Sequence, residues 1–369
     1  MSVRLFDCHV PQNRADDLGP LWQSGNLASG PAVAELEERL GAYLGCSSVV
    51  ALSDMTQALV LALQLAGVRA GDEVVTLAFN CMSSNAAIAL ARATPVWVDV
   101  DPSTMTVDLE DLASCVTART KAVIIYHVAG HLTDLEDLRN LCDTKGLPLI
   151  EDANNALGAK WQDRCAGTFG DYAVFSFYAN RQVNGIDGAA LVCPNPDVAE
   201  RARRLRRFGI DSYNFRTSDG EIDPKLDVPE IGFPASLANI NAKLACLGFD
   251  DLDTRLEHSR QNTRCLSAAF EDSKRLRFVN ELPRARSAFW VALVRCSDRD
   301  RVMAKLKASG IQCSRLHQRN DRYTGFKAHS RELPGTTTAE QEMLALPTGW
   351  WLSPVDIQRI IDSLRASLD

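Results

Sequence analysis

The strongest constraint on the fold is an alternation between short apolar segments and helical segments along the first half of the chain. The apolar segments are rich in Val and Ile, which is typical of buried strands. Strands that alternate with helices form βαβ units around a parallel or mostly parallel sheet, with helices on both faces. The expected strands are 49–52, 73–77, 95–99, 121–128 and 147–151, and the expected helices include 31–44, 83–91, 108–118 and 132–145.

A change in composition near residue 211 indicates a second, smaller domain. Residues 211–234 are polar and rich in turn-forming residues, and one long helix is expected over 238–266. Strand patterns at 289–294 and 311–314, flanked by helical patterns at 299–309 and 354–368, then predict a compact α+β unit. We expect an N-terminal arm at 1–30, a large α/β domain at 31–245 and a small α+β domain at 246–369.

Charge and composition exclude several classes of partner. The formal net charge of -7 argues against a nucleic-acid binder, because neutralising phosphates requires clustered Lys and Arg. The one basic cluster, at 201–207, has helical spacing and acidic neighbours, so we interpret it as a solvated helix face. Apolar stretches are interrupted well before membrane-spanning length. The 11 cysteines are scattered without a C-x-x-C pair, which favours reduced thiols in a cytoplasmic protein and no metal site.

Polar residues follow several of the expected strands. Asp152 ends one strand, Ser176 ends a second, and Arg181 lies five residues after Ser176. In sheets of this kind, ligands bind at the carboxyl ends of the strands. A carboxylate, a hydroxyl and a cation in this arrangement suit a flat, anionic ring that contains nitrogen. The turn 53–57 precedes a helix, so it is either an anion site or a plain helix cap.

Several short motifs, in order, give the chain a family resemblance. They include Gly71-Asp72-Glu73-Val74, Glu151-Asp152-Ala153, Phe175-Ser176-Phe177 and Leu205-Arg206-Arg207-Phe208-Gly209. With these motifs the chain resembles, nearly from end to end, the DegT/DnrJ/StrS family of sugar aminotransferases, which are fold-type-I pyridoxal-phosphate enzymes. The resemblance implies a seven-stranded type of sheet between helices, a small C-terminal domain, a small-molecule substrate and a homodimer.

The resemblance also implies roles for individual residues. Asp152 matches the carboxylate that pairs with the pyridine nitrogen and makes the ring an electron sink. Asn155 stands where the family has Gln or His near the ring hydroxyl, and Cys81 stands where many members stack an aromatic ring. The implied phosphate cradle consists of Ser176, Thr56 and the N–H groups of Met55, Thr56 and Gln57. The substrate-facing segment corresponds to His317, Arg319, Asn320 and Tyr323, for which surface-loop structure is the alternative.

The most important departure from the family pattern is Arg181, which stands where the family has the lysine of the internal aldimine. That route needs a neutral amine, which burial can produce from lysine. A guanidinium stays protonated and is a poor nucleophile and base. Pro234, Ser236 and Ala189 also depart from family positions, so we interpret the site as naturally altered.

Three functions are compatible with this pattern. The first is chemistry on a keto sugar or related ketone, dehydratase-like or modified amino transfer, with pyridoxamine or pyridoxal phosphate (PMP or PLP) bound non-covalently. In this hypothesis Arg181 holds an anion and His127 moves protons. The second is a cofactor-independent enzyme or a non-catalytic partner, and the third is ordinary transamination with another lysine. His127 and His131 are four residues apart, but the intervening Gly130 disfavours a helical zinc pair.

Overall fold

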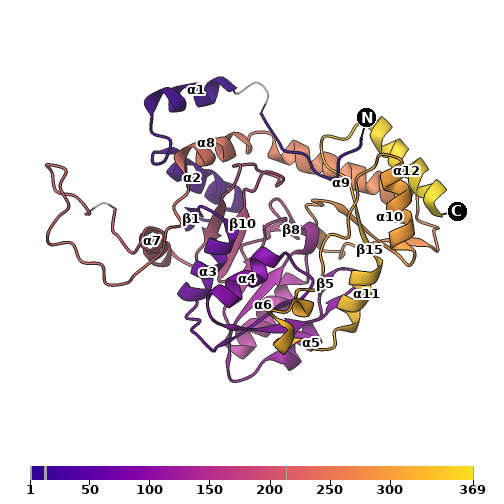
Figure 1. Ribbon diagram of the computed structural model, residues 1–369, viewed down its shortest axis with the longest axis horizontal. Helices are drawn as coiled ribbons and strands as arrows, with labels where there is room; N and C mark the ends of the chain where they lie inside the picture. The colour runs from indigo at the N-terminus through magenta and orange to yellow at the C-terminus, as the bar shows by residue number, and fades with distance from the viewer. Residues whose placement is uncertain (1, 12–14, 213, 369) are drawn as a thin grey trace.

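A seven-stranded sheet forms the centre of the computed structural model, which describes residues 2–11, 15–212 and 214–368 (Figure 1). The strand order is β1-β11-β10-β7-β6-β2-β3. All neighbours are parallel except those of β11, which is antiparallel to β1 and β10. The strands are β1 Val49–Leu52, β2 Glu73–Leu77, β3 Thr94–Val98, β6 Thr120–Tyr126, β7 Leu149–Asp152, β10 Tyr172–Ser176 and β11 Ala189–Val192. The predicted fold, a mostly parallel sheet between helices, is confirmed.

Helices cover both faces because successive strand residues point to opposite sides. In β1, Val49 and Ala51 join the core beneath one face, whereas Val50 and Leu52 join the core beneath the other. The first core includes residues of α2 Ala32–Leu44, α5 Leu109–Cys115, α6 Leu135–Lys145 and α8 Asn239–Leu247. The second includes residues of α3 Met55–Leu65, α4 Met82–Leu90 and α7 Pro196–Leu205.

A separate three-stranded antiparallel sheet has its own core. Its order is β12-β14-β15, from β12 Leu276–Phe278, β14 Ala292–Cys296 and β15 Met343–Leu346. The helices α9 Leu252–Ala268, α10 Arg299–Ala308 and α12 Pro354–Leu368 pack on it, and α11 Pro334–Glu342 precedes β15. Val3 belongs to this core and pairs with Ile311, so the N-terminal segment lies against these elements. The division at residues 30 and 245 stays a prediction.

Short elements complete the described part of the chain. They are β4 Val100–Asp101, β5 Thr106–Val107, β8 Lys160–Trp161, β9 Arg164–Cys165, β13 Ala285–Arg286 and the 3₁₀ turns Val128–Gly130, Asn320–Arg322 and Lys327–His329. The helix α1 Ala15–Ser24 and the loop between α7 and α8 project from the body (Figure 1). No helix in the described residues combines the length and the apolar character needed to cross a bilayer.

Three local predictions were wrong. The long helix expected over 238–266 is two helices, because α8 is capped at Gly248 and α9 begins only at Leu252. Residues 311–314 form isolated bridges to Val3 and Ala345 and no strand. The basic cluster is paired instead of simply solvated, since Arg203 and Arg206 contact Glu37 at 3.1 and 2.6 Å.

Asp99, just after β3, links the large sheet to α11. Its side chain is 7% exposed, and Oδ1 accepts hydrogen bonds from the N–H and hydroxyl of Thr336 at 2.6 and 2.7 Å. Oδ2 accepts from the N–H of Gly335 at 2.8 Å. The carboxylate therefore satisfies the N-terminal N–H groups of α11 from a distant part of the chain.

We expect Asp99→Asn to lower the free energy of unfolding by about 1–3 kcal/mol, because an NH₂ group would face an N–H donor in a buried position. Urea denaturation of the full chain measures this change. Asp108→Asn is the matched control, because Asp108 is an exposed cap of α5 and Asn caps helices as well as Asp. Equal effects of the two substitutions would contradict the conclusion that the buried Asp99 carboxylate stabilises the N-terminus of α11.

Candidate functional site

Asp152 is a fully buried carboxylate at the carboxyl end of β7. Its Oδ2 accepts a hydrogen bond from the Ser84 hydroxyl at 2.6 Å, and Oδ1 accepts from Nδ2 of Asn154 at 2.8 Å. Burial raises the pKa of Asp152, and these donors oppose that rise. The carboxylate has neutral hydrogen-bond donors, and the described residues form no ion pair with it.

The carboxyl ends of neighbouring strands bring other polar groups to the same edge. The register pairs Asp152 with Tyr126 of β6 and with Val174 of β10, two residues before Ser176. Asn155 Nδ2 donates to the Tyr126 hydroxyl oxygen at 2.6 Å, and that oxygen lies 3.2 Å from Nε2 of His317. The Asn155 Oδ1 is buried without a partner among the described residues.

The Tyr126 hydroxyl has a defined donor role. Its oxygen accepts from Asn155 and from the N–H of Ala129 at 3.2 Å, so its own proton is free to be donated to His317. Burial raises the pKa of Tyr126, whereas burial and the nearby charge of Arg181 lower the pKa of His317 to about 3. At neutral pH a protonated tyrosine therefore faces a neutral imidazole.

Arg181 lies in the same region, held by aromatic contact. Its guanidinium carbon is 4.6 Å from the centroid of the Trp290 ring, and Trp290 stacks on Phe6 at 4.4 Å. Nη1 donates to Asn180 at 2.5 Å, but Nε is buried without a partner among the described residues. Burial lowers the pKa of Arg181, and the negative charge of Asp152 counteracts this. Arg181 is therefore a largely buried cation that no carboxylate in the described residues pairs with.

The N-terminus of α3 carries a negative charge. Asp54 caps this helix, and its Oδ1 accepts from the Gln57 N–H at 3.0 Å. Met55 is buried, and Thr56 and Gln57 are half-buried. Ser176, whose Oγ accepts from the Tyr178 N–H at 3.2 Å, lies at the end of β10. The turn 53–57 is thus a helix cap in the structure, with a carboxylate as the capping group.

His127 lies in a different environment from the one expected. Its Nε2 is 3.0 Å from the Glu151 carboxylate, and neither side chain has exposed surface. Glu151 also accepts from the N–H groups of Gly167, Phe169 and Gly170 at 2.7–2.8 Å. At Gly167 the φ is +85° and an added Cβ would lie 2.3 Å from the Phe175 ring, so this loop requires glycine. The geometry does not support proton transfer by His127 in the pocket.

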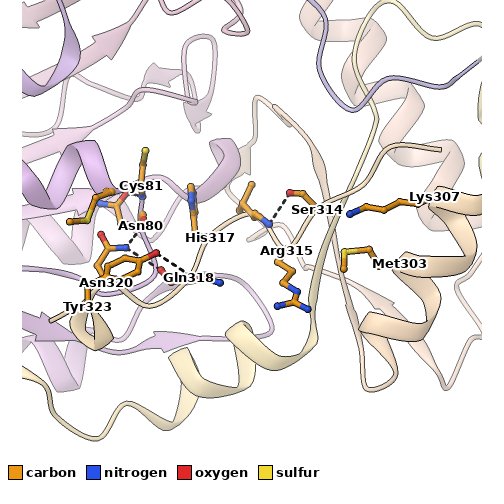
Figure 2. A pocket seen from close by; sticks show the side chains of 12 residues that line it. Asn80, Cys81, Met303, Lys307, Ser314, Arg315, His317, Gln318, Asn320 and Tyr323 are labelled. Carbon is orange, nitrogen blue, oxygen red and sulfur yellow. Dashed lines mark hydrogen bonds between the residues drawn. The ribbon is translucent and has the colours of Figure 1, made fainter. Parts of the chain in front are cut away.

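A groove of about 570 Å³ opens beside this cluster (Figure 2). Asn80, Cys81, Asn320 and Tyr323 lie together on one side, and Met303 and Lys307 of α10 lie on the other (Figure 2). His317, Gln318 and Arg315 also line it. Three of the four expected substrate-facing residues, His317, Asn320 and Tyr323, are therefore at the groove.

Arg319 does not face this groove. It is 5% exposed, and it forms a two-pronged ion pair with Asp321 at 2.9 and 2.6 Å. Nη1 also donates to the Thr337 hydroxyl at 2.6 Å. These contacts use its donors within the protein, which corrects the expected substrate contact. Cys81 does line the groove, where it is half-buried at the start of α4 and accepts a hydrogen bond from Ser83 at 3.0 Å.

Comparison with known proteins identifies the family. A family model described as the DegT/DnrJ/EryC1/StrS aminotransferase family matches residues 10–365. The chain belongs to this family. It is 30% identical over 341 residues to the "Pleiotropic regulatory protein" of Geobacillus stearothermophilus, and the match covers 89% of this chain and 87% of that protein.

Two solved structures are similar over almost the whole chain. AtS13 from Actinomadura melliaura has 30% identity and a TM-score of 0.93, with 99% of this chain and 98% of that chain covered. The sugar aminotransferase CalS13 from Micromonospora echinospora has 28% identity and a TM-score of 0.93, with 99% of both chains covered. The DegT/DnrJ/EryC1/StrS family and its fold are therefore established for this protein.

The pocket fits only part of the family's phosphorylated cofactor. A buried carboxylate without a cationic partner, as at Asp152, suits a protonated ring nitrogen. The other end does not fit, because the Asp54 carboxylate accepts the Gln57 N–H and places a negative charge at the helix terminus where a phosphate would bind. The residues present therefore do not fit the whole phosphorylated group.

Four residues of the site escaped sequence reasoning: Ser84, Tyr126, Asp54 and Trp290. Tyr126 and Trp290 lie in segments expected to be strands, where an aromatic residue usually indicates core packing. Ser84 lies inside a helix and contacts Asp152 from 68 positions away. Only Asp54 carries a sequence signal, because Asp before a helical run is typical of an N-cap.

His131 and His127 do not form a metal site. The His127 ring is paired with Glu151, and the described residues contain no cluster of three metal-binding side chains. His131 is 3% exposed, its ring contacts Phe289 edge-on at 5.3 Å, and neither ring nitrogen has a partner among the described residues.

His131 should make the protein sensitive to acid. Burial lowers its pKa from 6.5 to about 4, so between these values the unfolded chain binds a proton that the folded chain does not. Stability is therefore lost as the pH falls from 6.5 to 4, by up to about 3 kcal/mol at about 1.4 kcal/mol per unit. Urea denaturation of His131→Gln over this pH range should give a shallower decline than the wild type. The substitution His329→Gln, at an exposed histidine, is the control. Parallel declines for the wild type and both variants would refute the role of His131 in the loss of stability at acidic pH.

Proposed function

We propose that this protein is an enzyme of sugar or natural-product biosynthesis that binds its ligand non-covalently and does not form an aldimine with its own chain. The observation that carries the proposal is the buried guanidinium of Arg181, packed on Trp290 at the position where the resemblance implies a lysine. Membership of a sugar aminotransferase family supports a keto sugar or a related ketone as the substrate.

Arginine cannot replace lysine in that chemistry. A lysine loses its proton on burial and then adds to an aldehyde, whereas a guanidinium remains charged even where burial lowers its pKa. Arg181 can instead bind an anionic group or stabilise charge that develops on a substrate oxygen. Its unpartnered Nε is consistent with such a ligand contact.

Asp152 and Arg181 would bind opposite ends of a polar ligand. The buried carboxylate attracts a cationic or hydrogen-bond-donating group, and the guanidinium attracts an anionic or carbonyl oxygen. Between them, the Tyr126–His317 pair provides a hydroxyl proton and a neutral imidazole. We propose that His317, which lines the groove, has the proton-handling role for which the sequence suggested His127.

The requirement for a cofactor divides this proposal into two forms. Asp152 favours a non-covalently held PMP or PLP, whose ring stores electrons when its nitrogen is protonated. Asp54 at the α3 terminus favours a reaction without the phosphorylated group. Pro234 favours the same form, because it stands at a position where the family pattern has an Asn. We favour the second form, since the charge at α3 opposes a phosphate directly.

We also propose a cytoplasmic homodimer. The resemblance implies a dimer, and the projecting segments carry exposed apolar side chains: Trp22 of α1 is 66% exposed, and Ile231 of the loop before α8 is 75% exposed. Burying these side chains against a second copy would remove apolar surface from water.

The proposal predicts where an aldehyde attaches to the chain. Wild-type protein treated with pyridoxal or pyridoxal phosphate and then borohydride should carry no label at position 181 by peptide mass mapping. Arg181→Lys should gain an aldimine absorbance band and a label at that position with at least one of the two aldehydes, because lysine supplies the missing amine.

The exposed Arg277→Lys is the matched control for labelling of an added lysine. An aldimine on another lysine of the wild type that substrate-like ketones suppress by occupying the pocket would overturn the proposal in favour of ordinary transamination. Absence of label at position 181 in Arg181→Lys with both aldehydes would contradict the placement of Arg181 in the ligand pocket.

A further inference from the structure

The N-terminus of α3 has the wrong charge for an anion site. A helix terminus normally attracts anions through its free N–H groups and its dipole. Here Asp54 accepts from the Gln57 N–H at 3.0 Å and from the Ser53 hydroxyl at 3.3 Å, so a full negative charge already lies at this terminus. A second anion there would meet a carboxylate at short range.

No cation in the described residues neutralises Asp54 through an ion pair. Arg206, which contacts β1 just before this turn, is engaged elsewhere, since it binds Glu37 at 2.6 Å and the Ala51 carbonyl at 2.6 Å. The donors to Asp54 are a neutral hydroxyl and a neutral N–H. No protein cation in the described residues therefore compensates its charge at the N-terminus of α3 through an ion pair.

This terminus belongs to the same edge as the rest of the site. The register pairs Leu52 of β1 with Ala189 of β11, and Ala189 with Ser176 of β10. The helix α3, which follows β1, therefore starts two strands away from the end of β10. With strands about 4.8 Å apart, the end of β1 lies about 10 Å from Ser176. A ring that reaches Asp152 at one end would present its other substituent towards Ser176 and α3.

We propose that Asp54 is a charge filter, which excludes phosphate monoesters from the α3 end of the pocket and selects ligands that present a neutral or cationic group there. The inference rests on the proposed pocket but not on the reaction or on the state of Arg181. In this proposal the Asp54 side chain is the reason that the phosphorylated cofactor does not fit. The expected ligands are those without a phosphate group at this end.

Pyridoxamine and pyridoxamine phosphate test the filter, because they differ only in the phosphate and form no aldimine with surface lysines. Titration calorimetry of the full chain should give at least about tenfold tighter binding of pyridoxamine than of its phosphate. In Asp54→Asn, the phosphate ester should gain at least about tenfold in affinity, and pyridoxamine should change less than about twofold. Added salt should reduce the discrimination of the wild type.

Asn is as good a helix cap as Asp, so Asp54→Asn removes the charge and keeps the cap. Asp134→Asn is the matched control, because Asp134 caps α6 with hydrogen bonds of the same kind to Glu136 and Asp137. It should leave both affinities unchanged. Asp54→Ser, a second neutral cap, should reproduce the gain, which separates the charge effect from any local disturbance.

Several outcomes would overturn the filter. They are equal affinity of the wild type for the two amines, no gain of phosphate binding in Asp54→Asn and Asp54→Ser, or binding of neither amine by any variant. These results leave the labelling at position 181 unaffected, so failure of the filter and failure of the proposed function are read from different residues.

Discussion

The parallel alignment of β6, β7 and β10 is the constraint on which the site depends. Because these strands run in one direction, their carboxyl ends meet at one edge of the sheet, and the register sets Asp152 beside Tyr126. A shift of one residue would turn Asp152 towards the opposite face, where Glu151 now accepts three backbone N–H groups. The alternation of side chains thus separates a pocket carboxylate from a structural one.

The distribution of charge in the pocket differs from that of a phosphate-binding pocket. Two carboxylates, Asp152 and Asp54, lie at or just after the ends of strands that end at the same edge of the sheet, and Arg181 is a cation held by aromatic packing. Burying an unpaired charge is unfavourable unless a ligand or the protein compensates it. The family fold is retained, whereas our proposal is that the charges around the site no longer suit the family's phosphorylated cofactor, so family membership alone does not assign this protein its chemistry.

Individual residues show how far sequence reasoning reached into the site. Asp152, Ser176 and Arg181 were identifiable as candidates because each follows a strand signal, and topology alone brings strand ends together. His127 was misjudged because nothing local to it reveals that Glu151, 24 positions later, lies 3.0 Å away. Arg319 lies in a segment at the groove, but its own contacts with Asp321 and Thr337 depend on how that segment turns.

The sequence by itself determined the fold class and most of the alternation of strands and helices in the large domain, and it is the basis of the prediction that Arg181 stands where the family has a lysine. These features depend on local periodicity and on residue identity, which are fixed along the chain. Only the tertiary structure decided which charges compensate one another: Glu151 for His127, Asp321 for Arg319, and no described side chain for Asp54 or Arg181. Such pairing depends on distances between residues far apart in sequence, and a few ångströms decide whether a charge is neutralised or left to a ligand.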